Sequence, residues 1–208
     1  MARRNRFCPA HVTYHVVNRG NDRRVIFQDD AEYSSFLKLL AEGQRKAPVH
    51  LFGYCGMPTH FHLLVRPQTD TALSAYMQWV TGRYACDLRR ITKTVGHGHV
   101  FQRRFWSVPV GGRLAFLSVL RYIEANPVRA RLVTQAESWQ WSSYTDRARG
   151  GGLVRPLPFP LPEPWSNFVN TPQGEGILRR IRESLLPRQG RPCARLQSRT
   201  GLETPPEA

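Results

Sequence analysis

The chain has 208 residues, a hydrophobic fraction of 41% and a formal net charge of +15 at pH 7. This length suits one domain with an extension or two small domains, and the hydrophobic fraction is sufficient for a core. Of the 30 basic residues, 27 are arginines, and most of the charge falls before residue 150. Because the guanidinium fork matches phosphate, this excess favours a nucleic-acid partner over a merely basic surface.

Several protein classes do not fit the sequence. The four cysteines (Cys8, Cys55, Cys86 and Cys193) are scattered and form no CxxC pair, so a disulfide framework is not expected. Residues 1–10 read as a basic arm without the apolar run of a signal peptide. No stretch is long and apolar enough to span a bilayer. We expect a cytoplasmic, nucleoid-associated protein with no membrane partner.

The first two predicted elements are a strand and a helix. Residues 11–18 alternate and are rich in β-branched side chains, which predicts a strand. Turn residues follow at 18–22. Asp29 or Asp30 can cap a helix with apolar positions at helical spacing. Those positions are Tyr33, Phe36, Leu37 and Leu40.

A hairpin is predicted next. Residues 49–55 and 59–66 read as strands joined by a turn at 56–58. Asp70 or Thr71 then begins a second helix, whose apolar positions run from Leu73 to Ile91.

The last regular elements are a strand at 105–110 and a helix from 114 to about 126, ended by Pro127. The order β-α-β-β-α-β predicts an α+β, ferredoxin-like antiparallel sheet with one additional helix. We assign residues 11–148 to this domain and expect 139–144 to pack back onto it. Residues 149–208 read as a Pro-, Gly- and Arg-rich, largely irregular tail with a short helix near 176–186. This tail could bind DNA, cover the site or do neither.

Two histidines in the hairpin are candidate metal ligands. Side chains alternate along a strand, so His60 and His62 share one face of the predicted sheet. Neutral imidazole is a common ligand for transition metals. Tyr122 and Asn126 are four residues apart and share one face of the last helix. Pro127 disfavours a helical conformation for Asn126, which we place at the frayed end of the helix.

The chain resembles the HUH-type single-tyrosine transposases, and within them the REP-associated tyrosine transposases. The matching segments are 17–21 (Val-Asn-Arg-Gly-Asn), 60–62 (His-Phe-His), 101–105 (Phe-Gln-Arg-Arg-Phe), 121–130 (Arg-Tyr-Ile-Glu-Ala-Asn-Pro-Val-Arg-Ala) and 141–144 (Trp-Ser-Ser-Tyr). The resemblance covers roughly residues 10–147 in matching order and excludes the tail. Thr59 stands where many relatives have asparagine or glutamate.

The resemblance implies a catalytic domain that cuts and rejoins single-stranded DNA next to hairpins. It assigns His60, His62 and Asn126 as ligands of Mg²⁺ or Mn²⁺, and Tyr122 as the nucleophile of a covalent 5′-phosphotyrosine intermediate. Related transposases include monomers and homodimers, and both states are open here.

The residues themselves agree with those roles. A metal held by two imidazoles and an amide oxygen leaves positions for a phosphate oxygen, and a bis-imidazole site favours Mn²⁺ in affinity. The candidate contacts to the DNA backbone are Arg19, Arg103, Arg104 and Arg121, each of which could equally be a solvated surface arginine.

Other readings are possible for several residues. Tyr84 is the rival nucleophile, but it lies in the apolar stripe of its helix and reads as core. His97 and His99 lie among glycines and read as loop. His11 and His15 read as sheet residues, with a small chance of DNA contact. Zinc bound by Cys55 with the histidine pair would lack a fourth ligand.

A second function class is a non-catalytic protein that binds nucleic-acid hairpins and derives from a transposase. Stacking of single-stranded RNA on the open sheet face is less favoured, because adjacent strands carry no matching aromatic pattern. The catalytic reading also sets a structural condition. The helix with Tyr122 must cross the sheet face that carries both histidines.

Overall fold

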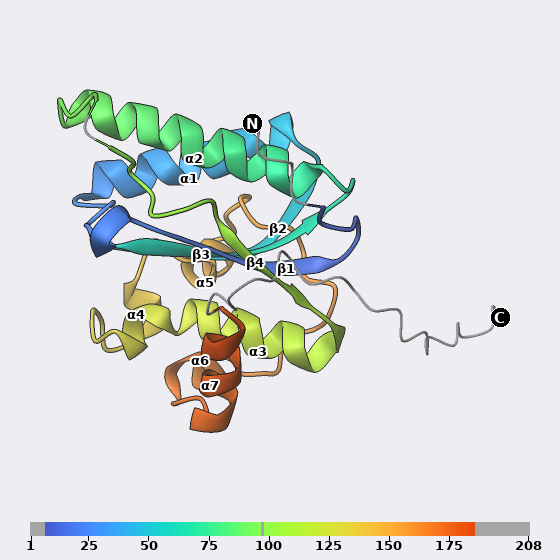
Figure 1. The fold of residues 1–208 in the computed structure, drawn as a ribbon. Helices are drawn as coiled ribbons and strands as arrows, with labels where there is room; N and C mark the ends of the chain where they lie inside the picture. Colours follow the sequence, from blue (N-terminus) through green and yellow to red (C-terminus); the bar gives the residue numbers. More distant parts are fainter. Residues whose placement is uncertain (1–6, 97, 186–208) are drawn as a thin grey trace.

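A four-stranded antiparallel sheet forms the centre of the computed structural model, which describes residues 7–96 and 98–185 (Figure 1). The strands are β1 (Thr13–Arg19), β2 (Val49–Met57), β3 (His60–Pro67) and β4 (Trp106–Val110). Their order across the sheet is β2-β3-β1-β4, with every neighbouring pair antiparallel. The expected ferredoxin-like sheet is confirmed, with β1 and β3 at its centre.

The β2–β3 hairpin is tighter than the sequence predicted. β2 does not end at Cys55 but continues to Met57, which pairs with His60. The turn is therefore limited to Pro58 and Thr59. Gly56 pairs with Phe61 in the ladder, and its N–H donates to the carbonyl of Trp141 at 2.9 Å.

Two long helices cover one face of the sheet. They are α1 (Asp30–Lys46) and α2 (Ala72–Ile91), which lie above the sheet in Figure 1. The α1 N-terminus is capped by Asp29, whose carboxylate accepts from the backbone N–H of Glu32 at 2.9 Å. The apolar stripes of both helices meet odd-numbered side chains of β3, such as Phe61, in the larger core cluster.

The opposite face is covered by α3 (Gly112–Glu124), which lies below the sheet in Figure 1. Its buried residues pack on Leu64 and Cys55 in a second core cluster. The helix breaks at Ala125 and continues as the short α4 (Asn126–Arg129). Pro127 has no N–H to donate to the preceding turn, which accounts for the break. Asn126 therefore begins a new turn and is 5% exposed.

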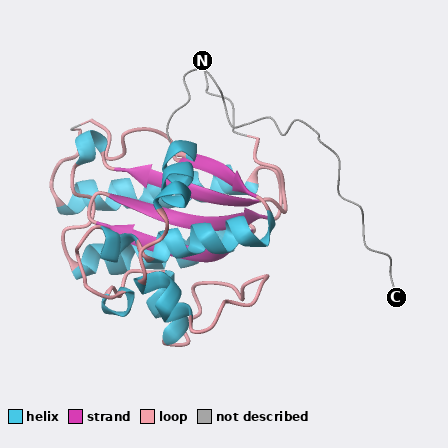
Figure 2. Ribbon diagram, turned by 90° about the horizontal axis from the view of Figure 1, so that it is seen from below, coloured by secondary structure: helices cyan, strands magenta, loops and turns pink. Residues whose placement is uncertain are grey.

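The segment after residue 148 differs from the predicted irregular tail. It follows α5 (Ser143–Ala148) and contains α6 (Trp165–Asn170) and α7 (Glu175–Ser184). Leu178 and Ile181 of α7 are buried in the same cluster as α3. Figure 1 shows α6 and α7 below the sheet beside α3, and Figure 2 views the molecule from that side. Helix α7 coincides with the short helix predicted near 176–186, whereas α6 was not predicted from the sequence. Residues 1–6 of the expected basic arm and residues 186–208 lie outside the described part.

Residues 139–144 pack back onto the domain, as predicted. The Trp141 ring stacks on Tyr33 with centroids 4.9 Å apart, and Trp139 Nε1 donates to the Gly56 carbonyl at 2.9 Å. The remaining short elements are the 3₁₀ turns η1 (Asn21–Arg23) and η2 (Ala136–Ser138). Within residues 7–96 and 98–185, no helix has the length and apolar character needed to cross a membrane.

Candidate active site

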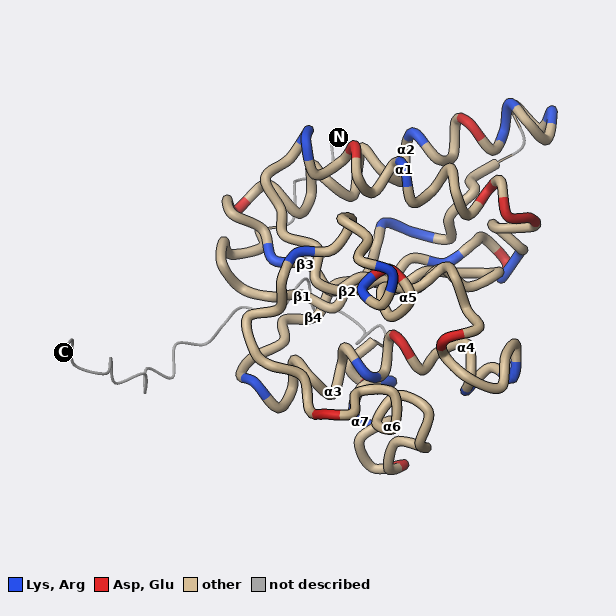
Figure 3. Tube along the Cα trace, turned by 180° about the vertical axis from the view of Figure 1, so that it is seen from behind, with Lys and Arg blue, Asp and Glu red and all other residues tan. Residues whose placement is uncertain are grey.

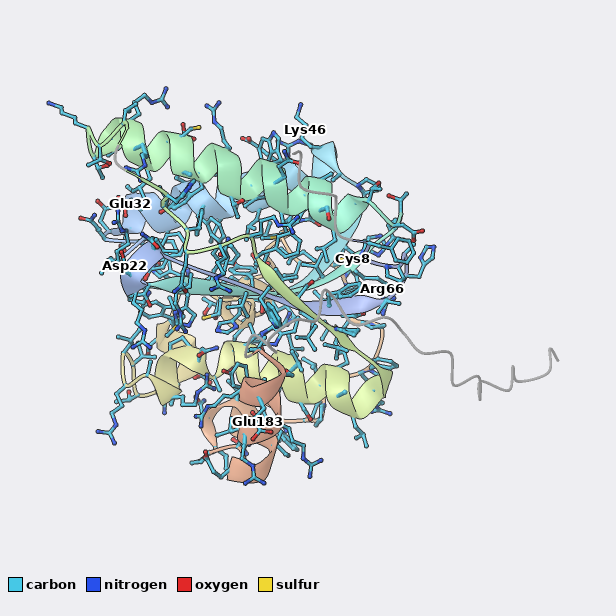
Figure 4. The ribbon with its side chains drawn as sticks, in the orientation of Figure 1. Cys8, Asp22, Glu32, Lys46, Arg66 and Glu183 are labelled. Carbon is cyan, nitrogen blue, oxygen red and sulfur yellow. The ribbon has the colours of Figure 1, made fainter. Side chains whose placement is uncertain are left out.

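The strand register places three histidines on one face of the sheet. His62 lies opposite Val17, and His60 lies opposite Arg19, on neighbouring strands. His15 lies two residues before Val17 on β1, so alternation brings it to the same face. The site thus lies where β1 ends and β3 begins. Asp22, labelled in Figure 4, follows β1 and marks this end of the sheet.

Helix α3 crosses this same face and brings Tyr122 to the histidines. The Tyr122 ring meets His62 edge-on, with ring centroids 5.7 Å apart and an interplanar angle of 83°. It meets His15 in a similar way at 5.9 Å and 70°. The structural condition set by the sequence is therefore met within one chain.

Each histidine of the pair has its Nδ1 occupied by another side chain. His62 Nδ1 lies 2.9 Å from Nε2 of His15, and His60 Nδ1 lies 3.1 Å from the hydroxyl of Thr59. The His60 and His62 ring centroids are 5.0 Å apart. Because Nδ1 is engaged on both rings, Nε2 is on each the nitrogen available to a ligand. Thr59, which departs from the family pattern, thus contacts a proposed ligand directly.

All three imidazoles favour the neutral form. Burial, with a smaller effect of nearby Arg129, lowers the pKa of His15 to about 3. Burial and then Arg19 lower the pKa of His60 to about 4. Burial followed by the neighbouring histidines lowers the pKa of His62 well below its ordinary value. A neutral imidazole keeps the lone pair that a metal requires.

Asn126 is held beside Tyr122 by Arg129. The Arg129 guanidinium donates to Asn126 Oδ1 and lies over the Tyr122 ring, with Cζ 4.0 Å from the centroid. It also donates to the Tyr122 carbonyl at 3.4 Å. The buried Nδ2 of Asn126 has no hydrogen-bond partner among the described residues. An amide N–H does not bind a cation, so Oδ1 is the atom of this side chain that could serve as a metal ligand.

The donor set fits a divalent transition metal. Two neutral imidazoles supply nitrogen, and the sp² oxygen of Asn126 has a second lone pair besides the one that Arg129 uses. Within the described residues, no group of three or more His, Cys, Asp or Glu side chains could hold a metal ion. The zinc set built on Cys55 therefore gains no support, and any third protein ligand must be of another type, such as an amide.

A groove of about 1350 Å³ opens over the site. His60, His62 and Tyr122 line it, together with side chains of α2 and of the segment before β4. That segment is anchored beside β1, since Gln102 N–H donates to the Arg19 carbonyl at 2.9 Å. The chain then bends through residues 102–104 before Trp106 enters β4.

Three of the four predicted DNA-contacting arginines line this groove. Arg19 comes from the end of β1, and Arg103 and Arg104 come from the bend before β4. All three are exposed. Arg121 is not brought to the groove. Its guanidinium donates to the Thr171 carbonyl at 3.1 Å, because the tail helices cover the outer side of α3.

Tyr84 and His11, two of the alternatives that the sequence offered, lie outside the site formed by His60, His62 and Tyr122. Tyr84 is 2% exposed in the larger core cluster and donates to the Ile26 carbonyl, as its apolar stripe predicted. His11 lies before β1 at positive φ. His99 is exposed at the groove, and His97 lies outside the described residues.

Sequence reasoning gave no role to several residues of the site. His15 was assigned to the sheet, with a small chance of DNA contact, and its contact with His62 depends on strand register. Arg182 and Leu185 reach the groove from the tail. Arg129 could have been found, because it lies three residues after Asn126 and seven after Tyr122, a spacing that places all three on one helical face.

Comparisons with known proteins concern the family and the fold. The family model for IS200-like transposases matches residues 8–126. A solved structure of a REP-associated tyrosine transposase bound to a REP hairpin has a TM-score of 0.56 and 21% identity, covering 77% of this chain and 91% of that one. A protein from Deinococcus radiodurans R1 described as a candidate transposase has a TM-score of 0.42 and 14% identity, covering 59% and 95%. No curated protein matches the chain.

Proposed function

The chain belongs to the IS200-like transposase family, and we propose that it is a metal-dependent endonuclease and strand transferase for single-stranded DNA. It acts next to DNA hairpins through a covalent 5′-phosphotyrosine intermediate. One observation carries this proposal. Tyr122 packs edge-on against His62, and both line the same groove as His60.

His60, His62 and Asn126 would hold Mn²⁺ or Mg²⁺. Two imidazoles favour Mn²⁺ in affinity, while Mg²⁺ prefers oxygen ligands. A bound divalent cation supplies a Lewis acid that orients and neutralises the scissile phosphate. The chain itself supplies neutral imidazoles at pH 7, because burial lowers the pKa of His60 to about 4.

Tyr122 is the nucleophile in this proposal. Its phenolic oxygen attacks the phosphorus and loses its proton as the new P–O bond forms. The bond between phosphorus and the 3′ oxygen breaks, and that oxygen takes up a proton to become a 3′ hydroxyl. The Arg129 guanidinium, 4.0 Å above the ring, stabilises the negative charge that develops on the phenolic oxygen. Phosphotyrosine conserves the bond for later strand joining.

The groove supplies the surface for the substrate strand. Arg19, Arg103 and Arg104 carry positive charge toward phosphates, and Phe101 and Trp106 offer rings on the same lining. Tyr122 contacts the histidines of its own chain, so cleavage in cis by a monomer is the arrangement we expect. The fold neighbour bound to a REP hairpin motivates a hairpin next to the cleavage point.

A non-catalytic hairpin-binding protein is the second candidate. The observation that favours it is the hydrogen bond that Asn126 Oδ1 already accepts from the Arg129 guanidinium. A binding protein would use the same groove and need no free ligand oxygen.

A covalent-adduct assay separates the two. The chain is incubated with a labelled single strand that flanks a hairpin, together with Mn²⁺ or Mg²⁺, and adducts that resist denaturation are counted. We expect an adduct with the native chain and with the core variant Tyr84→Phe, and none with Tyr122→Phe. An adduct that survives Tyr122→Phe contradicts the assignment. Tight hairpin binding without any adduct favours the binding protein.

A further inference from the structure

His15 contacts His62, one of the two proposed histidine ligands, directly. Its Nε2 lies 2.9 Å from Nδ1 of His62, and the two rings stack with centroids 5.1 Å apart at 29°. The side chain is 1% exposed. We propose that His15 is a positioning residue that accepts a hydrogen bond from Nδ1–H of His62 and so leaves His62 Nε2 free for the metal. This inference rests on the metal site of the proposed function.

The direction of this hydrogen bond decides whether His62 can be a ligand. A neutral imidazole carries one N–H and one lone pair, on different nitrogens. If His62 donates from Nδ1, its Nε2 holds the lone pair. If His15 donates instead, the proton of His62 sits on Nε2 and blocks the metal. A buried acceptor at Nδ1 therefore sets the tautomer of a metal ligand.

The neighbouring histidine follows the same pattern. His60 Nδ1 lies 3.1 Å from the Thr59 hydroxyl, whose oxygen can accept a hydrogen bond from Nδ1–H. Both proposed ligands thus have Nδ1 engaged by another side chain and Nε2 available to a metal. Two independent contacts, one from β1 and one from the hairpin turn, orient the two rings in the same sense.

His15 is not itself a third imidazole ligand. Its Nε2 is engaged by His62, and no group of three His, Cys, Asp or Glu side chains in the described part could hold a metal. Its ring instead also contacts Tyr122, with centroids 5.9 Å apart at 70°. One buried side chain therefore positions both a proposed ligand and the proposed nucleophile.

The alternative is that His15 only fills space in the core. The two roles predict different results for two variants. His15→Phe keeps a ring of similar size but removes the acceptor. His15→Gln loses the ring but can place an amide oxygen near the former Nε2. If His15 only packs, the His15→Phe variant should bind metal more tightly than His15→Gln. If His15 accepts a hydrogen bond, the order should be reversed.

Metal binding to the DNA-free chain gives the first readout. Mn²⁺ affinity is measured by the electron paramagnetic resonance signal of the free ion. We expect His15→Phe to weaken binding by roughly 10- to 100-fold, as for other partners of metal-bound histidines, and His15→Gln to recover most of it. His50→Phe, on β2 and outside the groove lining, is the matched control and should bind as the native chain does.

Tautomers give a second readout that needs neither metal nor activity. Long-range ¹H–¹⁵N spectra of the metal-free native chain should show His62 protonated on Nδ1, and this state should be lost in His15→Phe. Native His62 protonated on Nε2 overturns the inference. So does unchanged Mn²⁺ affinity in His15→Phe with a native circular dichroism spectrum, or a His15→Gln variant as weak as His60→Ala.

These measurements also separate the inference from the proposed function. Mn²⁺ binding that is lost in His15→Phe and regained in His15→Gln supports the role of His15 even if no DNA adduct forms. That combination would contradict the proposed transposase chemistry but not the role of His15. A native chain that does not bind Mn²⁺ would overturn the metal site, and the inference with it.

Discussion

Arg129 connects the proposed nucleophile to the proposed amide ligand. Its guanidinium lies over the Tyr122 ring and donates to Asn126 Oδ1. Burial lowers the pKa of this guanidinium, but an arginine remains charged at neutral pH. A partly buried cation therefore sits beside the position where the phenol would lose its proton.

We expect Arg129→Gln to slow adduct formation about fivefold, because a cation over an aromatic ring contributes on the order of 1 kcal/mol. Arg129→Lys should recover part of the rate, since it keeps the charge without the planar fork. The measurement is the single-turnover rate of adduct formation at saturating DNA and Mn²⁺. A faster rate in Arg129→Gln would instead show that the guanidinium competes with the metal for Asn126.

At the scale of elements, one buried carboxylate joins the helices below the sheet. Glu124 of α3 is fully buried and accepts from the Ser143 hydroxyl at 2.6 Å and from Trp165 Nε1 at 2.7 Å. It also forms an ion pair with Arg147. Because Glu124 is two residues from Tyr122, this network fixes the end of α3 that carries the proposed nucleophile.

Glu124→Gln should destabilise the fold by about 3 kcal/mol. Removing one partner of a buried ion pair costs roughly 3 to 5 kcal/mol, and Arg147 is 21% exposed, which favours the lower end. Urea denaturation measures the change. Glu183→Gln, which removes an exposed pair with Arg179 (Glu183 is labelled in Figure 4), is the control and should change stability by less than about 1 kcal/mol. Equal effects of the two variants would show that the network is not stabilising.

At the scale of the molecule, basic residues are distributed over both helical layers and the loops beside the sheet (Figure 3). Overall charge alone therefore does not locate the DNA. We expect the DNA to lie in the groove, because Arg19, Arg103 and Arg104 line it together with Tyr122. Specific contacts should be distinguishable from general attraction by their dependence on salt.

We expect the double variant Arg103→Gln/Arg104→Gln to weaken binding to single-stranded DNA and to lower the slope of log K against log salt by about 1.4. Each phosphate contact contributes about 0.7 to this slope on single strands. The double variant Arg45→Gln/Arg113→Gln makes the same change in net charge outside the groove lining. Titrations at several salt concentrations compare the two. Identical slopes would remove the groove from the DNA-binding surface.

The sequence alone was sufficient for the sheet, its two covering helices and the pairing of His60 with His62. These features follow from local periodicity, since alternation and helical spacing decide which side chains share a face. Tyr84 could also be assigned to the core in this way. The same reasoning predicted that α3 would end at Pro127, because proline cannot donate to the preceding turn.

Only the tertiary structure decided which side chains from different elements meet. The contact between His15 and His62 depends on the register of β1 against β3, which no local pattern specifies. Helix α6 and the contact of Arg121 with Thr171 depend on how the tail packs against the outer side of α3, whereas α7 was predicted from the sequence. The metal and the DNA remain proposals, whereas the shared face of Tyr122, His60 and His62 follows from where α3 crosses the sheet.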